Sequence, residues 1–334
     1  MSAPAAAILG VSGTVLGAEE RDFLRAADPW GFILFARNVD RPGQLRTLCA
    51  SLREAVGRDA PILIDQEGGR VQRLRAPHWR EFRPALDQMA RAQRPIRAQW
   101  VRNRLIAHEL NQMGIDVNAA PLADLVEDET HPVLKNRLYG SDISTVIEAA
   151  RACADAFLAG GVLPVLKHIP GYGRGHVDSH HALPHVSASR EALAARDFAP
   201  FHGLRDIRMG MTAHIVMDAI DPERPATVSP DVIRVIRDDI GFDGLMMTDD
   251  ISMEALSGSV AERSAAAIAA GCDVVLHSNG RLVEMGAVVE AAGRLSERGQ
   301  ARAAAALAER RPPTPVDIHA LDAELEALMR GTDP

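Results

Sequence analysis

Short apolar segments with the composition of β-strands alternate along this chain with longer segments of helical periodicity. The helices expected between the strands include residues 41–57, 144–161, 229–242 and 260–271. Eight strands interleaved with helices over about 280 residues predict parallel βα units. The eight expected strands cover residues 8–16, 31–38, 61–69, 115–124, 162–171, 210–217, 244–252 and 272–279.

The expected strands are almost continuously apolar, which is typical of parallel strands covered on both faces. An eight-stranded (β/α)8 barrel of the TIM type is the natural closure, and its typical size of about 250 residues fits this chain. A doubly wound sheet is the alternative, but no glycine-rich fingerprint follows any expected strand. No linker or repeat divides the chain, so residues 1–334 are expected to form a single α/β barrel domain with a helical tail from about residue 281.

Composition narrows the classes of function. The net charge of −8 argues against a nucleic-acid or anionic-membrane partner, and no apolar run approaches the roughly 18 residues of a membrane span. Cys49, Cys153 and Cys272 lie far apart without CxxC spacing, as expected of reduced thiols in the cytosol. The N-terminal residues lack a basic segment, so they predict a strand and not an export signal, and a cytoplasmic protein.

Ionisable residues stand where several expected strands end. In a βα barrel the catalytic groups lie at the carboxyl ends of the strands and in the loops that follow. A salt-bridged strand end would explain any single case, but four at the same topological position predict one polar pocket. These strand ends carry Asp65-Gln66-Glu67, Lys167-His168, His214 and Asp249-Asp250.

A histidine-rich loop follows the strand that ends in Lys167-His168. Asp178 precedes His180 by two residues, so its carboxylate can orient the imidazole for proton transfer. A zinc site would instead want an HExxH helix or histidines fixed on rigid elements. The glycines of the loop favour a mobile acid/base over a metal site. The histidines of the loop are His176, His180, His181 and His185.

Four segments in the same order resemble glycoside hydrolase family 3, and within it the single-domain bacterial β-N-acetylglucosaminidases of cell-wall recycling. The resemblance extends from about residue 5 to 280. Larger members of the family add a second domain that supplies the acid/base, and the Asp-Ser-His loop replaces it in the single-domain branch. The segments are IDQEGGRVQRL (64–74), LKHIPGYGRGHVDSHHALP (166–184), TAHIVMDAIDP (212–222) and GFDGLMMTDDISMEAL (241–256).

The resemblance implies a role for individual residues. Asp249 matches the family nucleophile, and His180, aided by Asp178, matches the histidine acid/base. Ile169 and Tyr172 depart from the usual Phe and His of the family segment, which puts the motion of the loop in question. The residues expected to hold the sugar or line its pocket are Asp65, Arg73, Arg137, Lys167, His168 and His214.

The resemblance implies a retaining β-N-acetylglucosaminidase that releases terminal N-acetylglucosamine from peptidoglycan fragments, the anhydro-muropeptides. No metal and no other cofactor is expected, and the partner is a saccharide or muropeptide bound by a monomer or weak oligomer. A route assisted by the substrate's 2-acetamido group would reduce Asp249 to a stabilising charge. Two other classes stay open: a phosphorylase or β-glycosidase of different sugar specificity on the same barrel, and a non-enzymatic sugar-binding protein.

Overall fold

The computed structural model of the chain describes residues 3–175 and 183–330. Four of the residues singled out above, His176, Asp178, His180 and His181, lie outside the described residues. The part of the chain that is described includes every other candidate site residue.

Nine short strands form one all-parallel sheet that closes on itself. The two ends of the sheet order, β5 and β6, are consecutive in sequence and separated by Val165 alone. Strand β5 pairs with β4 and β6 pairs with β8, so this one interrupted strand completes the ring and confirms the expected eight-position barrel. The order is β5 (Leu163–Pro164), β4 (Val117–Asn118), β3 (Ile62–Ile64), β2 (Pro29–Leu34), β1 (Ala5–Gly10), β11 (Val274–His277), β10 (Leu245–Asp250), β8 (Met209–Thr212) and β6 (Leu166–Ile169).

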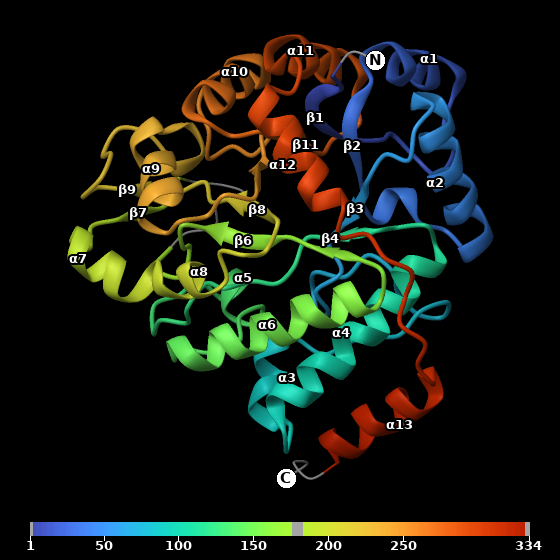
Figure 1. Ribbon diagram of the computed structural model, residues 1–334, viewed down its shortest axis with the longest axis vertical. Coiled ribbons are helices and arrows are strands. Elements are labelled where there is room, and N and C mark those ends of the chain that lie inside the picture. Colours follow the sequence, from blue (N-terminus) through green and yellow to red (C-terminus); the bar gives the residue numbers. More distant parts are fainter. Residues whose placement is uncertain (1–2, 176–182, 331–334) are drawn as a thin grey trace.

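Helices surround the strands, as Figure 1 shows. Their ends follow local chemistry: a proline opens α2 and Gly57 ends it at a φ of 63°, a left-handed conformation that suits glycine. The crossover helices are α1 (Ala18–Ala27), α2 (Pro42–Val56), α3 (Ala85–Arg91), α4 (Pro95–Gln112), α5 (Pro132–Lys135), α6 (Ile143–Ala159), α7 (Arg190–Ala192), α8 (Ala199–Gly203), α9 (Pro230–Arg234), α10 (Val260–Ala270) and α11 (Leu282–Ala292). The chain after them forms α12 (Glu297–Leu307) and α13 (Ile318–Met329).

Several boundaries differ from those expected. The first strand is residues 5–10 and not 8–16, because the chain leaves the sheet after Gly10 and turns into α1. The segment 210–217 splits into β8 and β9 (Val216–Met217), which pairs with β7 (His185–Val186) outside the barrel. The expected helix 229–242 is α9 followed by one π-helical turn, Val235–Asp239.

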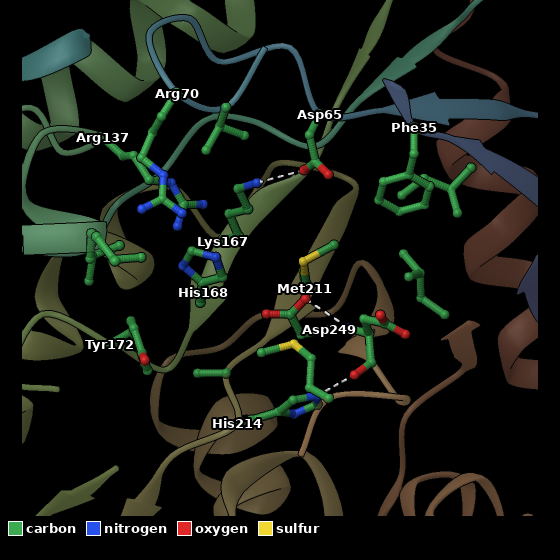
Figure 2. A pocket seen from close by; sticks show the side chains of 18 of the residues that line it. Phe35, Asp65, Arg70, Arg137, Lys167, His168, Tyr172, Met211, His214 and Asp249 are labelled. Carbon is green, nitrogen blue, oxygen red and sulfur yellow. Dashed lines mark hydrogen bonds and ion pairs between the residues drawn. The ribbon is translucent and has the colours of Figure 1, made fainter. Parts of the chain in front are cut away.

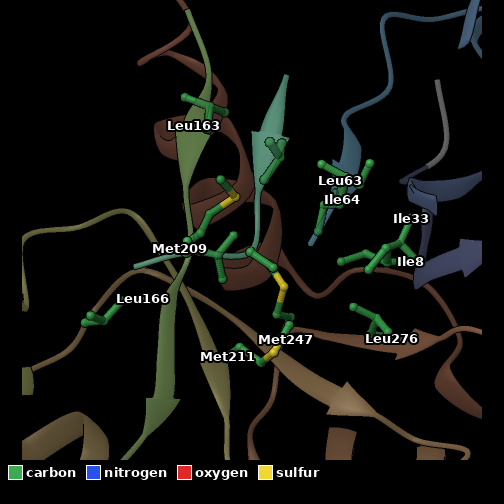
Figure 3. Packing of buried hydrophobic residues seen from close by; sticks show 14 of the residues in the cluster. Ile8, Ile33, Leu63, Ile64, Leu163, Leu166, Met209, Met211, Met247 and Leu276 are labelled. Atoms are coloured by element: carbon green, nitrogen blue, oxygen red, sulfur yellow. The ribbon is translucent and has the colours of Figure 1, made fainter. Parts of the chain in front are cut away.

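The barrel strands are buried on both faces, as their apolar composition predicts. In Figure 3 the side chains of Ile8, Leu63, Met209 and Met247 are among those that fill the core. Met211 belongs to this core and also lines the cavity described below. The end of the core that contains Met211 therefore forms the floor of the site. Among the described residues no helix is both long and apolar enough to cross a membrane.

Candidate active site

A cavity of about 260 Å³ lies at the carboxyl ends of the barrel strands. This is close to the lower end of the roughly 300–1,000 Å³ typical of small-molecule sites and suits a single sugar unit. All the described candidates for nucleophile and sugar binding line it together, and Figure 2 shows most of them. They are Asp65, Arg73, Arg137, Lys167, His168, His214 and Asp249.

Charged side chains on one side of the cavity form a continuous network. The Nζ of Lys167 lies 3.1 Å from Oδ1 of Asp65 and 2.6 Å from Oε1 of Glu67. Arg137 donates to both oxygens of Glu67 at 2.8 Å, and Nη2 of Arg73 lies 3.2 Å from Oδ2 of Asp65. Charge-assisted and bidentate bonds of this kind fix both distance and orientation. The network therefore holds three cations in place before any ligand binds.

Glu67 joins two of these cations, although it was not among the residues expected to bind the sugar. Burial would raise the pKa of this carboxyl, but Arg137 and Lys167 hold the pKa well below its usual range. Glu67 is therefore a permanent anion that aligns two sugar-binding candidates. Its position at the strand end Asp65-Gln66-Glu67 could have marked Glu67 as a site residue. Its pairing with Arg137 and Lys167, which are 70 and 100 positions away, is not visible in the sequence.

Asp249 is the penultimate residue of strand β10, on the other side of the cavity, and in Figure 2 it lies near Met211 and His214. The backbone N–H of Asp250 donates to its Oδ1 at 2.8 Å. Burial acts to raise the pKa of Asp249, but the neighbouring His214 and His168 together with this hydrogen bond lower it below its usual value. Within the described residues no cationic side chain forms a salt bridge with Asp249. Its carboxylate is therefore ionised at neutral pH and forms no salt bridge with a cation of the described residues.

His214 is fixed beneath Asp249 by two hydrogen bonds. Its Nε2 lies 3.0 Å from the carbonyl oxygen of Asp250, and its Nδ1 lies 2.8 Å from Oγ1 of Thr227. Burial lowers the pKa of His214, so the ring is neutral. A carbonyl can only accept, so we assign the proton to Nε2, with Nδ1 accepting from the Thr227 hydroxyl. Thr212 extends the chain at 2.8 Å from Thr227.

Asp124 is a second residue that was not among the expected site residues. Its Oδ2 lies 2.8 Å from Nδ1 of His168, and its Oδ1 accepts from the backbone N–H of Tyr172 at 2.7 Å. We assign the Nδ1 proton of His168 to this bond, which leaves Nε2 for the cavity. Asp124 is the last residue of the expected strand 115–124, so the strand-end rule applied to the other candidates would have selected it.

The histidine-rich loop is described only in part. His185 is exposed, and its Nδ1 lies 3.1 Å from Oδ1 of Asp218. His180 and Asp178, the expected acid/base and its partner, lie outside the described residues. Among the residues that are described, no group of three or more His, Cys, Asp or Glu side chains has an arrangement that could hold a metal ion.

The sequence of this chain is similar to a known protein family and to known relatives. Residues 10–308 match the family model described as the glycosyl hydrolase family 3 N-terminal domain. The chain is 36% identical over 280 residues to the β-hexosaminidase of Pseudomonas aeruginosa, with 82% of each chain covered. The β-hexosaminidase of Alkalilimnicola ehrlichii is likewise 36% identical over 280 residues, with 81% of this chain and 80% of that relative covered.

Solved structures agree with these relatives. The crystal structure of NagZ from Neisseria gonorrhoeae in complex with N-trifluoroacetyl-D-glucosamine superposes with a TM-score of 0.84 at 28% identity, covering 99% of this chain and 97% of that one. A family 3 β-N-acetylglucosaminidase from Paenibacillus gives a TM-score of 0.85 at 29% identity, covering 96% of this chain and 66% of that one.

Proposed function

Since this chain belongs to glycoside hydrolase family 3 and is a β-N-acetylhexosaminidase, we propose that it works by retention through a covalent glycosyl-enzyme. We further propose that its substrate is an N-acetylglucosaminyl anhydro-muropeptide and that it acts in the cytoplasm. The gonococcal NagZ structure is a complex with N-trifluoroacetyl-D-glucosamine, an N-acylated glucosamine, which supports an N-acetylglucosamine unit in the cavity. The muropeptide and the location rest on the sequence resemblance.

The observation that carries the mechanism is the state of Asp249. A nucleophilic carboxylate must be ionised and must not be held by a cation, and Asp249 meets both conditions among the described residues. In the first step an oxygen of Asp249 bonds to the anomeric carbon while the glycosidic C–O bond breaks, and His180 protonates the leaving oxygen. In the second step water attacks the same carbon, His180 takes its proton, and the bond to Asp249 breaks.

The network around Glu67 would bind the hydroxyls of the sugar. Lys167, Arg137 and Arg73 retain N–H donors beyond those used by Asp65 and Glu67, because an ammonium carries three donors and a guanidinium five. Such charged donors strengthen as charge develops in the transition state. Asp65 would accept from a hydroxyl, so the same network offers both donors and an acceptor to one sugar ring.

The test is a panel of substrates with purified enzyme. We expect cleavage of an aryl β-N-acetylglucosaminide in preference to the matching glucoside and xyloside, and release of N-acetylglucosamine from the anhydro-disaccharide. Product analysis with and without inorganic phosphate separates hydrolysis from phosphorolysis. Failure to cleave the anhydro-disaccharide would overturn the proposed substrate, and a sugar phosphate as the main product would overturn hydrolysis.

A further inference from the structure

Arg70 differs from every other described residue that lines the cavity, because it alone is exposed. In Figure 2 it lies at the edge of the group of labelled residues. An enzyme that removes a terminal sugar encloses that sugar, and the remainder of the substrate must extend through the open side. Its exposure places Arg70 at this open side of the cavity.

No carboxylate of the described residues pairs with Arg70 either. Each of the other cationic side chains in the cavity binds a carboxylate: Arg73 binds Asp65, Arg137 binds Glu67, and Lys167 binds both. Among the described residues Arg70 has neither a hydrogen bond nor a salt bridge from its guanidinium. An unpaired guanidinium with five donors in a planar fork is suited to a carboxylate or another planar anion.

The backbone that carries Arg70 is fixed. The residues from Glu67 to Val71 form a tight turn in which the N–H of Glu67 donates to the carbonyl of Val71 at 2.8 Å. Gly69 has a φ of 58°, in the left-handed region, and its N–H donates to the carbonyl of Phe82 at 2.7 Å. The turn begins at Glu67, a member of the charged network. Arg70 is therefore attached by a rigid segment to the residues that are proposed to hold the sugar.

We propose that Arg70 is a specificity-determining residue that binds a carboxylate on the leaving part of the substrate. This inference rests on the proposed function, since it assumes that the terminal sugar occupies the cavity. Arg70 takes no part in bond breaking. Its contact would raise kcat/KM for substrates whose leaving part carries the anion and leave neutral leaving parts unaffected.

The test uses a matched pair of disaccharides: N-acetylglucosamine β-1,4-linked to N-acetylmuramic acid, and the methyl ester of the same compound. The two differ in the charge of the lactyl group and by one methyl group. We expect Arg70→Ala to lower kcat/KM about five- to tenfold on the acid and less than about twofold on the ester, because only the acid offers an ionic partner. Arg70→Lys should restore most of the loss, and added salt should narrow the difference.

The matched control is Arg46→Ala, which removes an exposed arginine of α2 that has no salt bridge to another described residue. It should leave both substrates unchanged. Equal values for the acid and the ester in the wild type, or equal losses on both in Arg70→Ala, would overturn the role of Arg70 while leaving the proposed activity intact. If the wild type cleaves aryl N-acetylglucosaminides but neither of these disaccharides nor the anhydro-disaccharide, the proposed substrate fails instead.

Discussion

The role of a side chain at the site depends on its binding partners as well as on its chemical type. Asp249 lines the cavity and Glu67 binds two of the cations that line it, yet Glu67 is bound by Arg137 and Lys167, whereas no described cation forms a salt bridge with Asp249. Binding to two cations makes Glu67 unavailable for attack on a carbon atom. The same kind of group therefore has a structural role in one place and is suited to chemistry in the other.

Replacement of Asp249 by alanine should abolish turnover, because the covalent step loses its nucleophile. We expect the rate to fall to less than about a hundredth of that of the wild type, while the circular dichroism spectrum is unchanged. The measurement is steady-state hydrolysis of an aryl N-acetylglucosaminide. A variant that keeps a higher rate would indicate that the substrate's own acetamido group supplies the nucleophile.

The loss of activity when His180 is replaced by alanine should depend on the leaving group of the substrate. A disaccharide needs its departing oxygen protonated, so we expect a loss on the order of 10²–10⁴-fold, the usual contribution of a general acid. An aryl glycoside with an acidic phenol needs little protonation and should lose much less. Equal losses on both substrates would argue against the acid role.

The other histidines of the loop provide the control for this assignment. His176→Ala, His181→Ala and His185→Ala should each have small effects, and activity should survive EDTA. Losses comparable to that of His180→Ala at two or more of these positions, together with inactivation by EDTA, would identify a metal site in place of a single acid/base.

At the scale of elements, the sequence predicted types better than boundaries. The parallel βα order followed from apolar strands between periodic helices, and the helices 41–57 and 260–271 match α2 and α10 to within a residue. Helix α4 was not among those named, because buried polar side chains such as Arg102 and Asn103 interrupt its apolar periodicity. Their burial depends on packing against other elements, which no local pattern contains.

The same limit applies to the site. Residues at strand ends could be selected because a barrel brings those ends together. Which side chain pairs with which could not, since Lys167 and Asp65 are 102 positions apart in the sequence and His168 and Asp124 are 44 positions apart. The network of Glu67 and the orientation of His168 are therefore results of the fold.

Helix α10 offers a test of local sequence chemistry near the site. Ser259 and Glu262 form a reciprocal capping box at its start, immediately after the segment that carries Met253 into the cavity. Ser259→Ala should lower the free energy of unfolding by about 1 kcal/mol, because an N-terminal N–H loses its acceptor. The measurement is urea denaturation, with the exposed Ser257→Ala as the control. A loss no larger than that of the control would contradict the capping role.

At the scale of the whole molecule, stability should depend on pH through buried histidines. Burial lowers the pKa of His108, His214 and His277 from the ordinary value of 6.5. The unfolded chain therefore binds protons below pH 6.5 that the folded chain does not, so acidification favours unfolding. Burial raises the pKa of Glu109 and Asp116, so at lower pH the folded chain binds protons on these groups more readily than the unfolded chain does. This effect favours the folded state on acidification.

We expect the free energy of unfolding to decrease between pH 7.5 and 5.5, with a slope approaching about 1.4 kcal/mol per pH unit below pH 6.5, equivalent to one proton. Below about pH 4.5 the paired carboxylates should add to the loss, because the pKa values of Glu67 and Asp65 are lowered in the folded state. Urea denaturation at a series of pH values measures the slope. A free energy that is constant from pH 7.5 to 5.5 would contradict the expectation.

The pairing of β1 with β11 has a consequence for the order in which the protein can be completed. Ala7 lies beside Val275, so β1 acquires its second neighbour only after the ribosome has added all the residues between them. At a synthesis rate of about 5–20 residues per second, β1 waits on the order of tens of seconds with one open edge. During that time its exposed N–H and C=O groups can pair with another nascent chain. The same closure that gathers the active site therefore makes translation the period in which the protein most needs protection by chaperones.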